Sequence, residues 1–364
     1  MKKAIIWILI VLLLLGGGAT LYYLFSIGAI GFELPATNEP VRGDLIALFT
    51  EPATEPPATE PEPTEPVATE PAPTEPAPTE PTDPADPSAP TEPEGGEEEK
   101  PPREITAADY FVYDMREREF LELTCHETAK IYPASITKLM SCYTALQHWQ
   151  PDDVLTVGTE ISLINWDSSR AYLQQGDTLT VEQCIQAMLL PSGNDAAYTL
   201  AANTGRKVTG KKGLSDEAAI DAFVKEMNRV AQEIGMDNSH FVTCDGMHLA
   251  QHYTCARDLT ILIHEILKTP AILDSAAMLS ATADLGSHTR TWKNTNLLLN
   301  PKSTYYVPYA MGLKTGYTSY AGNCLLSLFF DDDRLYLVGT FNSPNYYGRF
   351  ADNKQLYESI FEEN

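Results

Sequence analysis

Residues 133–140 of this chain read PASITKLM. Proline is favoured in the first turn of a helix, and the apolar residues that follow recur at helical spacing as far as Leu146. We therefore expect a helix that begins near Pro133. What surrounds this helix in the sequence then decides the fold.

Strand-like segments lie toward both ends of the sequence that follows residue 100, with helical segments between them. The expected strands are Tyr110–Asp114, Phe120–Leu123, Tyr309–Thr315, Cys324–Phe330 and Leu335–Phe341, and the last two are joined by the turn 331–333. The further expected helices are Val181–Leu190, Glu217–Ile234, Ala256–Leu267 and Gly348–Glu362. Because strands from both ends would share one core, we expect an α/β fold with one sheet assembled from distant segments and a helical middle region.

The helix of residues 133–146 carries the first chemical signal, Ser135 and Lys138. Residues three apart share a face of a helix, so the lysine amine would lie beside the serine hydroxyl. Serine becomes a nucleophile when a base takes its proton, and a buried lysine can be that base. The Ser-x-x-Lys pattern is common by chance, and an exposed helix face fits it equally well.

Ser192-Gly193-Asn194 is the second signal, where the apolar residues 188–191 give way to a polar turn. The Ser192 hydroxyl could relay a proton, and the Asn194 amide could hold a substrate carbonyl or position a lysine. An ordinary turn or helix cap explains the triplet alone.

Lys314-Thr315-Gly316 is the third signal, at the end of a strand-like run. A lysine beside a threonine hydroxyl suits a carboxylate, and Gly316 would let another backbone approach closely. A backbone N–H just beyond could complete an oxyanion hole with the N–H of Ser135.

The three signals together resemble the serine penicillin-recognising enzymes in order and spacing. With their flanks (133–140, PASITKLM; 189–197, LLPSGNDAA; 312–318, GLKTGYT) they are similar to the serine D-Ala-D-Ala carboxypeptidase family, the low-molecular-weight penicillin-binding proteins. The resemblance runs from about residue 105 to the C-terminus. It implies the β-lactamase/transpeptidase-like fold, with an antiparallel five-stranded sheet flanked by helices.

The resemblance also implies a role for each matched residue. Ser135 would attack the penultimate D-Ala of a peptidoglycan stem peptide and Lys138 would accept its proton, while β-lactams would acylate the same serine. Ser192 and Asn194 would join the proton network, and Lys314 would supply a second cation. Thr315 would bind the substrate carboxylate, and the N–H groups of Ser135 and Tyr317 would form an oxyanion hole. Gly316 separates Thr315 from Tyr317 in this substrate-binding segment.

The sequence departs from the family pattern in a few places. Tyr317 stands where many relatives carry His, and Cys244 where Pro is more usual. These changes bear on efficiency more than on activity. We expect neither the additional β-rich domain nor the C-terminal amphipathic anchor of many relatives.

Other functions compete with carboxypeptidase activity. A D,D-transpeptidase would differ only in using an amine as acceptor. A serine β-lactamase shares the fold, but no convincing Glu-x-x-Leu-Asn provides its deacylating base in a middle loop. A non-catalytic wall-binding module is disfavoured because Ser135 and both lysines are present.

The N-terminal region predicts attachment to a membrane. Residues 4–32 carry no charge after Lys2 and Lys3, a length sufficient to span a bilayer. We expect residues 1–32 to be an uncleaved anchor with the remaining chain outside the cell. Cleavage as a signal peptide, followed by secretion, is the alternative.

Residues 33–100 are expected to form an acidic Thr-Glu-Pro-rich linker to a catalytic domain of residues 101–364. The chain has a net charge of −25, and residues 51–100 contain 15 acidic residues, one lysine and 15 of the 26 prolines. Such a composition favours an extended, disordered spacer. The rest is only mildly acidic, and nothing predicts nucleic-acid binding.

The cysteine and histidine patterns predict neither a metal nor another cofactor. The six cysteines lack metal-ligand spacing, so we expect free, mostly buried thiols, with a Cys244–Cys255 bridge left open. His248 and His252 are four residues apart but fall in an expected loop, which argues against a zinc peptidase. We interpret them as surface or supporting residues.

Overall fold

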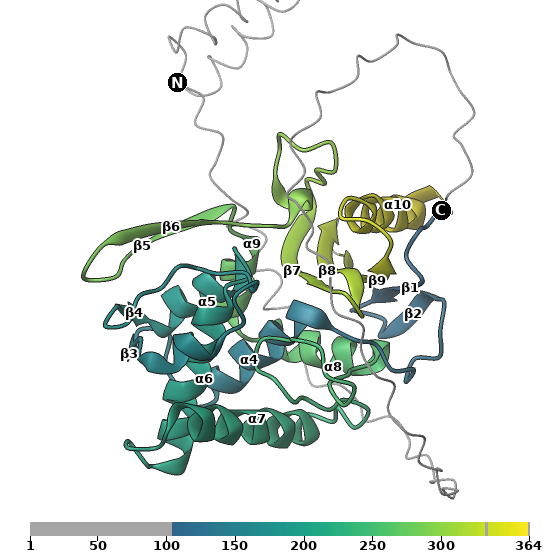
Figure 1. Cartoon of the computed structure of the whole chain (residues 1–364). Helices are drawn as coiled ribbons and strands as arrows, with labels where there is room; N and C mark the ends of the chain where they lie inside the picture. Colours follow the sequence, from purple (N-terminus) through teal and green to yellow (C-terminus); the bar gives the residue numbers. More distant parts are fainter. Residues whose placement is uncertain (1–103, 332–333, 363–364) are drawn as a thin grey trace, which may run out of the picture. The chain divides into compact units, whose positions relative to one another are not determined.

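A five-stranded antiparallel sheet forms the centre of the computed structural model, which describes residues 104–331 and 334–362 (Figure 1). The strand order is β2-β1-β9-β8-β7. The strands are β1 (Asp109–Asp114), β2 (Glu119–Leu123), β7 (Ala310–Thr318), β8 (Gly322–Asp331) and β9 (Arg334–Ser343). The sheet expected from distant segments is therefore confirmed, and β7 is one of its two edge strands.

The pairing of β1 with β9 joins the two ends of the described sequence. Asp109 lies opposite Phe341 and Asp114 opposite Tyr336 in an antiparallel register. The β8–β9 hairpin is also confirmed by its register, although Asp332 and Asp333 of its expected turn lie outside the described residues.

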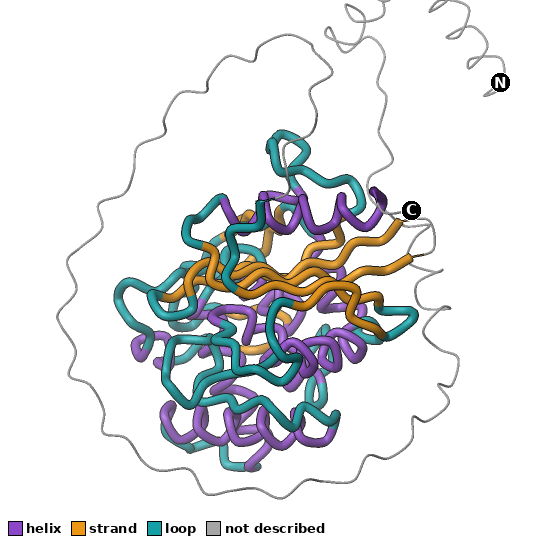
Figure 2. The backbone as a smooth tube through the Cα atoms, turned by 90° about the vertical axis from the view of Figure 1, so that its right-hand side faces the viewer, coloured by secondary structure: helices purple, strands orange, loops and turns teal. Residues whose placement is uncertain are grey.

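Helices cover both faces of the sheet (Figure 2). The closing helix α10 (Gly348–Glu362) packs on one face over a core that includes Val112, Phe329, Val338 and Phe350. The helical middle of the chain lies on the other face. Its helices are α4 (Thr137–Leu146), α5 (Val181–Leu189), α6 (Asn194–Thr209), α7 (Asp216–Glu233), α8 (Ala256–Ile266) and α9 (Pro270–Ala277).

Helix α6 was not expected, because the sequence interpretation stopped at the polar turn before it. Residues 194–209 have many small side chains and a weak apolar stripe. These small residues let α7 approach closely: a Cβ on Gly205 would lie 1.8 Å from the carbonyl oxygen of Ala219. Close packing of α6 against α7 therefore accounts for this helix better than an amphipathic sequence pattern does.

Two small two-stranded sheets were also missed. They are formed by β3 (Val154–Thr156) with β4 (Thr178–Thr180), and by the hairpin of β5 (Ser280–Asp284) with β6 (Thr289–Lys293). Their strands are short, and β5 and β6 have few large apolar residues, so they give little alternating signal. In Figure 1 the β5–β6 hairpin projects away from the main sheet.

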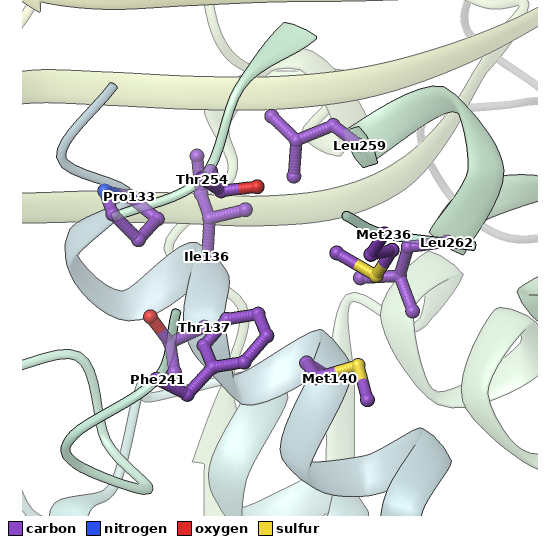
Figure 3. A pocket seen from close by; sticks show the side chains of 9 residues that line it. All are labelled: Pro133, Ile136, Thr137, Met140, Met236, Phe241, Thr254, Leu259 and Leu262. Atoms are coloured by element: carbon purple, nitrogen blue, oxygen red, sulfur yellow. The ribbon is translucent and has the colours of Figure 1, made fainter. Parts of the chain in front are cut away.

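Apolar side chains from α4 and from the short 3-10 helix before it (Ala134–Ile136) line a small cavity together with side chains of α8 (Figure 3). Ile136 and Met140 face Leu259 and Leu262 across a cavity of about 10 Å³, room for no more than one water molecule. The cavity is too small for a peptide. Its size shows instead that the helix carrying Lys138 is tightly packed.

The cysteines are free thiols, as expected. Five of them are buried and Cys125 is partly exposed. Cys244 and Cys255 are both free, so the disulfide between them that the sequence left open is not formed. Within residues 104–331 and 334–362, no helix combines the length and hydrophobicity needed to cross a bilayer. The expected anchor (1–32) and linker (33–100) lie outside the described residues and stay predictions.

Candidate active site

Ser135 lies in a short 3-10 helix, η1 (Ala134–Ile136), that leads directly into α4. Its side chain is half-buried, whereas Lys138 one turn later is fully buried. The Nζ atom of Lys138 lies 2.9 Å from the Oγ atom of Ser135. The alternative of an exposed helix face is therefore wrong for this pair.

Lys138 has two further polar neighbours. Its Nζ atom lies 2.7 Å from Oδ1 of Asn194 and 3.0 Å from the carbonyl oxygen of Asp245. Burial lowers the pKa of Lys138 to about 8, against the opposing effect of the Asp245 carboxylate. A neutral amine can donate its two N–H groups to Asn194 and Asp245 and accept a proton from Ser135. The geometry therefore suits a general base.

The Ser192–Asn194 turn places Asn194 at the start of α6. Ser192 adopts a φ of 64°, and a Cβ on Gly193 would lie 2.7 Å from the carbonyl oxygen of Ala187, so the turn requires glycine there. Ser169 holds the turn through its Oγ atom, which donates to the Ser192 carbonyl, and its carbonyl, which accepts from the Asn194 N–H. This bracing fixes the amide that faces Lys138.

The Lys314–Gly316 triplet lies inside β7, which corrects the expectation that it ends a strand. The β7–β8 ladder continues to the pair Thr318–Gly322, because β8 begins earlier than its apolar run suggests. A Cβ on Gly316 would lie 3.0 Å from the Pro133 carbonyl oxygen and 3.2 Å from the Ser135 nitrogen. The expected close approach at Gly316 is confirmed, and it brings β7 against η1.

Lys314 is buried beside other cations. Burial first, and then the positive charges of Lys138 and Arg349, hold its pKa well below the usual range for lysine. Its Nζ atom donates to the carbonyl oxygen of Thr315 at 2.9 Å, and the Thr315 hydroxyl pairs with that of Thr295. Tyr317, by contrast, is 64% exposed.

Sequence reasoning missed two groups that support the site. Arg349 of α10 is buried and its Nη1 atom donates to the Gly316 carbonyl at 3.0 Å. Gly246 has a φ of 88°, and a Cβ there would lie 1.9 Å from the Ala134 carbonyl oxygen, so the loop with the Asp245 carbonyl packs closely on η1. Gly246 and Arg349 are both more than 100 residues away from Ser135 in the sequence. Their contacts with the site arise only from the folding of the chain.

His252 is a buried supporting residue, the second of the two alternatives that the sequence left open. Burial lowers the pKa of His252 to about 4, so the ring is neutral at neutral pH. Its Nδ1 atom accepts from the N–H groups of Val242 and Thr243, so its Nε2–H donates to the Thr137 hydroxyl at 2.8 Å. His252 thereby connects the loop of Val242 and Thr243 to Thr137, the residue before Lys138. Across the described part of the chain, no His, Cys, Asp and Glu side chains gather in a metal-binding group.

Solved structures with a similar fold include a DD-transpeptidase and a penicillin binding protein. A crystal structure of the Streptomyces K15 DD-transpeptidase matches with a TM-score of 0.64 and 26% identity, over 71% of this chain and 98% of that one. Penicillin binding protein 6B from Escherichia coli matches with a TM-score of 0.59 and 28% identity, over 71% of this chain and 78% of that one. The expected β-lactamase/transpeptidase-like fold is confirmed.

The family model for D-alanyl-D-alanine carboxypeptidases (peptidase S11) matches residues 96–338. The match covers more than half of the chain, which therefore belongs to this family. A D-alanyl-D-alanine carboxypeptidase of Streptomyces sp. strain K15 is 34% identical over 43% of this chain and 53% of its own length. The DacA carboxypeptidase of Haemophilus influenzae is 27% identical over 71% and 62% respectively. The chain thus spans about half to three fifths of the length of these curated relatives.

Proposed function

We propose that this protein is a serine D-Ala-D-Ala carboxypeptidase that removes the terminal D-Ala from peptidoglycan stem peptides. The observation that carries the proposal is the contact between Ser135 and a buried Lys138 whose pKa is lowered to about 8. A hydroxyl 2.9 Å from an amine that can lose its proton near neutral pH has the geometry of an activated nucleophile.

Acylation would begin with attack of Ser135 Oγ on the carbonyl carbon of the penultimate D-Ala. Lys138 accepts the serine proton, and the N–H groups of Ser135 and Tyr317 hold the negative oxygen of the tetrahedral intermediate. The close approach of Gly316 to the Ser135 nitrogen supports that pairing of donors. Breakage of the C–N bond then releases D-Ala, whose amine takes a proton through the Lys138, Ser192 and Asn194 network.

Water completes the reaction by attacking the acyl-enzyme, with Lys138 again as base. Ser135 Oγ regains its proton as the ester bond breaks, and the shortened peptide leaves as a carboxylate. A β-lactam would acylate Ser135 in the same way. Its ring-opened product stays attached to the amine leaving group, which favours a long-lived adduct.

The sheet side of the site would bind the terminal carboxylate of the substrate. The Thr315 hydroxyl lies on β7 beside the amine of Lys314, which is deficient in negative partners. A carboxylate arriving there would stabilise the protonated amine and raise its pKa again. Substrate recognition would thus rest on β7 and proton transfer on η1 and α4.

D,D-transpeptidation is the second candidate, and the name of the Streptomyces K15 structure favours it. It shares the acylation step and differs in the acceptor, an amine in place of water. An assay of D-Ala release from diacetyl-L-Lys-D-Ala-D-Ala separates the two. An added amine acceptor would lower the yield of free diacetyl-L-Lys-D-Ala without lowering D-Ala release.

We extend the proposal to location and domain organisation. Residues 1–32 would anchor the chain in the cell membrane, residues 33–100 would space the enzyme from it, and residues 101–364 would form the catalytic domain outside the cell. At about 3.1 Å per residue, an extended linker segment of fifty residues reaches on the order of 150 Å. Fractionation of cells that produce the protein tests this arrangement. We expect the full-length chain in the membrane fraction, whereas a chain that lacks about the first 19 residues and is found in the medium would contradict the anchor.

The function is tested by incubating the protein with diacetyl-L-Lys-D-Ala-D-Ala and measuring free D-Ala. We expect release by the wild type and none above background by Ser135→Ala. Thr128→Ala serves as the control, because it removes a side-chain hydroxyl in the segment before η1 whose hydrogen bond to His126 is exposed. Release of D-Ala by Ser135→Ala, or none by the wild type, would contradict the proposal.

A further inference from the structure

Three aromatic side chains gather in one cluster outside the catalytic groups described above. The ring of His248 stacks on that of Tyr320 at 4.0 Å between centroids, and the rings of Tyr132 and His248 are nearly perpendicular, with their centroids 4.7 Å apart. Tyr320 is 59% exposed and Tyr132 38% exposed. We call these three residues the rim cluster, because aromatic faces this open to solvent are available to a ligand.

Each member of the rim cluster belongs to a segment that also forms the candidate active site. Tyr132 precedes Ser135 by three residues, and His248 follows Asp245, whose carbonyl binds Lys138, by three residues. Tyr320 lies in the turn that follows β7 and Tyr317. The backbone contact of Gly246 with Ala134 brings the His248 loop against η1. The three segments that carry the rim cluster therefore also carry the groups around Ser135.

The direction of a bound peptide follows from the proposed function, on which this inference rests. The terminal carboxylate would meet Thr315, and the reacting carbonyl would lie between Ser135 and the Tyr317 N–H. A peptide extended along the free edge of β7 would then run toward Thr318 as it is followed back toward its own N-terminus. With about 3.3 Å per residue, its third residue from the end lies beyond Tyr317, on the side of Tyr320.

We propose that the rim cluster is the subsite for the side chain of this third residue, and that it favours an aliphatic side chain ending in an ammonium group. Aromatic faces attract cations and pack well against methylene groups. The cluster contributes two tyrosines and a histidine, with no carboxylate of its own, so ring faces rather than an ion pair would hold the amine.

The charge state of His248 agrees with this role. Burial lowers the pKa of His248 below its ordinary value, so the ring is neutral at neutral pH. A neutral imidazole stacked on Tyr320 extends the electron-rich surface, whereas a protonated one would repel an ammonium group.

Matched peptides test the proposal on the full-length chain. The substrates are Nα-acetyl-X-D-Ala-D-Ala with X as L-lysine, Nε-acetyl-L-lysine or L-norleucine, which keeps the methylene groups and lacks the amine. We expect the wild type to favour the lysine peptide over the other two about three- to tenfold in kcat/KM for D-Ala release.

Variants then locate the preference. Tyr320→Ala is expected to bring the ratio between lysine and norleucine peptides close to one, and Tyr320→Phe to keep most of it because the ring remains. Tyr309→Ala, at an exposed tyrosine directly before the opposite end of β7, should leave the ratio unchanged. The rate of fluorescent penicillin attachment to Ser135 reports whether each variant keeps an intact site.

Two results would overturn the inference: equal use of the lysine and norleucine peptides by the wild type, or an unchanged preference in Tyr320→Ala. The absence of D-Ala release from every peptide would instead defeat the proposed function. In that case the same peptides are compared as competitors of penicillin attachment, and equal protection by lysine and norleucine peptides then rejects the subsite.

Discussion

The helical and sheet sides of the candidate site each contain a buried lysine, but the two amines have opposite surroundings. Lys138 meets Ser135, Asn194 and a backbone carbonyl, and the Asp245 carboxylate partly offsets the lowering of its pKa by burial. Lys314 has Lys138 and Arg349 as charged neighbours, and these cations lower its pKa further.

This difference assigns different tasks to the same residue type. An amine with a pKa of about 8 can exchange a proton with Ser135 near neutral pH. An amine among cations gains most from the arrival of an anion, such as the carboxylate of a substrate. We infer that the helical side moves the proton and that the sheet side recognises the substrate.

Removal of the helical lysine should have the largest effect. Lys138→Ala is expected to slow acylation by fluorescent penicillin by about 10²- to 10⁴-fold, the usual contribution of a general base. Lys268→Ala, at a surface lysine paired with Glu265, is the control and should react like the wild type. A loss of less than tenfold in Lys138→Ala would break the assignment of the base.

The pH dependence of acylation distinguishes the two lysines. Lys138 must be neutral to accept a proton, so acylation should rise with pH and level off above about 8. Below that value we expect a decrease of about tenfold for each pH unit, as the protonated fraction grows. Lys314→Gln should keep this inflection, because the base remains. A rate that is independent of pH between 6 and 8 would contradict the account.

Recognition of the carboxylate is the next effect in size. The wild type should prefer a peptide ending in D-Ala-D-Ala over its C-terminal amide by about 10- to 100-fold, the value of a charge-assisted hydrogen bond. Lys314→Gln should close most of this gap, mainly through KM. Lys302→Gln, at an exposed lysine ahead of β7, is the matched control. An equal preference in Lys314→Gln and the wild type would show that the sheet side does not read the carboxylate.

The last effect concerns stability. Native His252 has a pKa of about 4, against about 6.5 in the unfolded chain, so between these values the unfolded state binds more protons. Stability from this residue is therefore present above pH 6.5 and is lost on acidification, by about 2 kcal/mol between pH 7 and 5. Urea unfolding at the two pH values measures it. His252→Gln should show a smaller difference between pH 7 and 5, and an identical difference would refute this contribution.

Local patterns were sufficient to predict much of the fold. The apolar runs around residues 110–123 and 324–341 predicted strands that the structure contains, and Gly348–Glu362 was predicted with the bounds it has. The short hairpins and α6 were not predicted, because small or polar residues give them little periodicity. Tertiary packing, as at Gly205, decides those segments.

The candidate site divides in the same way. Short motifs pointed to Ser135, Lys138, Asn194 and Lys314, because each combines a reactive group with a recognisable spacing. The Asp245 carbonyl and Arg349 were missed, since a backbone oxygen carries no residue-specific signal and an arginine in the last helix approaches β7 only in three dimensions.

Peptide mapping by mass spectrometry after treatment with penicillin identifies the nucleophile itself. We expect one covalent adduct, located on the peptide that contains Ser135 and absent from Ser135→Ala, with its formation much slower in Lys138→Ala. An adduct on another residue, or an adduct that persists in Ser135→Ala, would contradict this assignment.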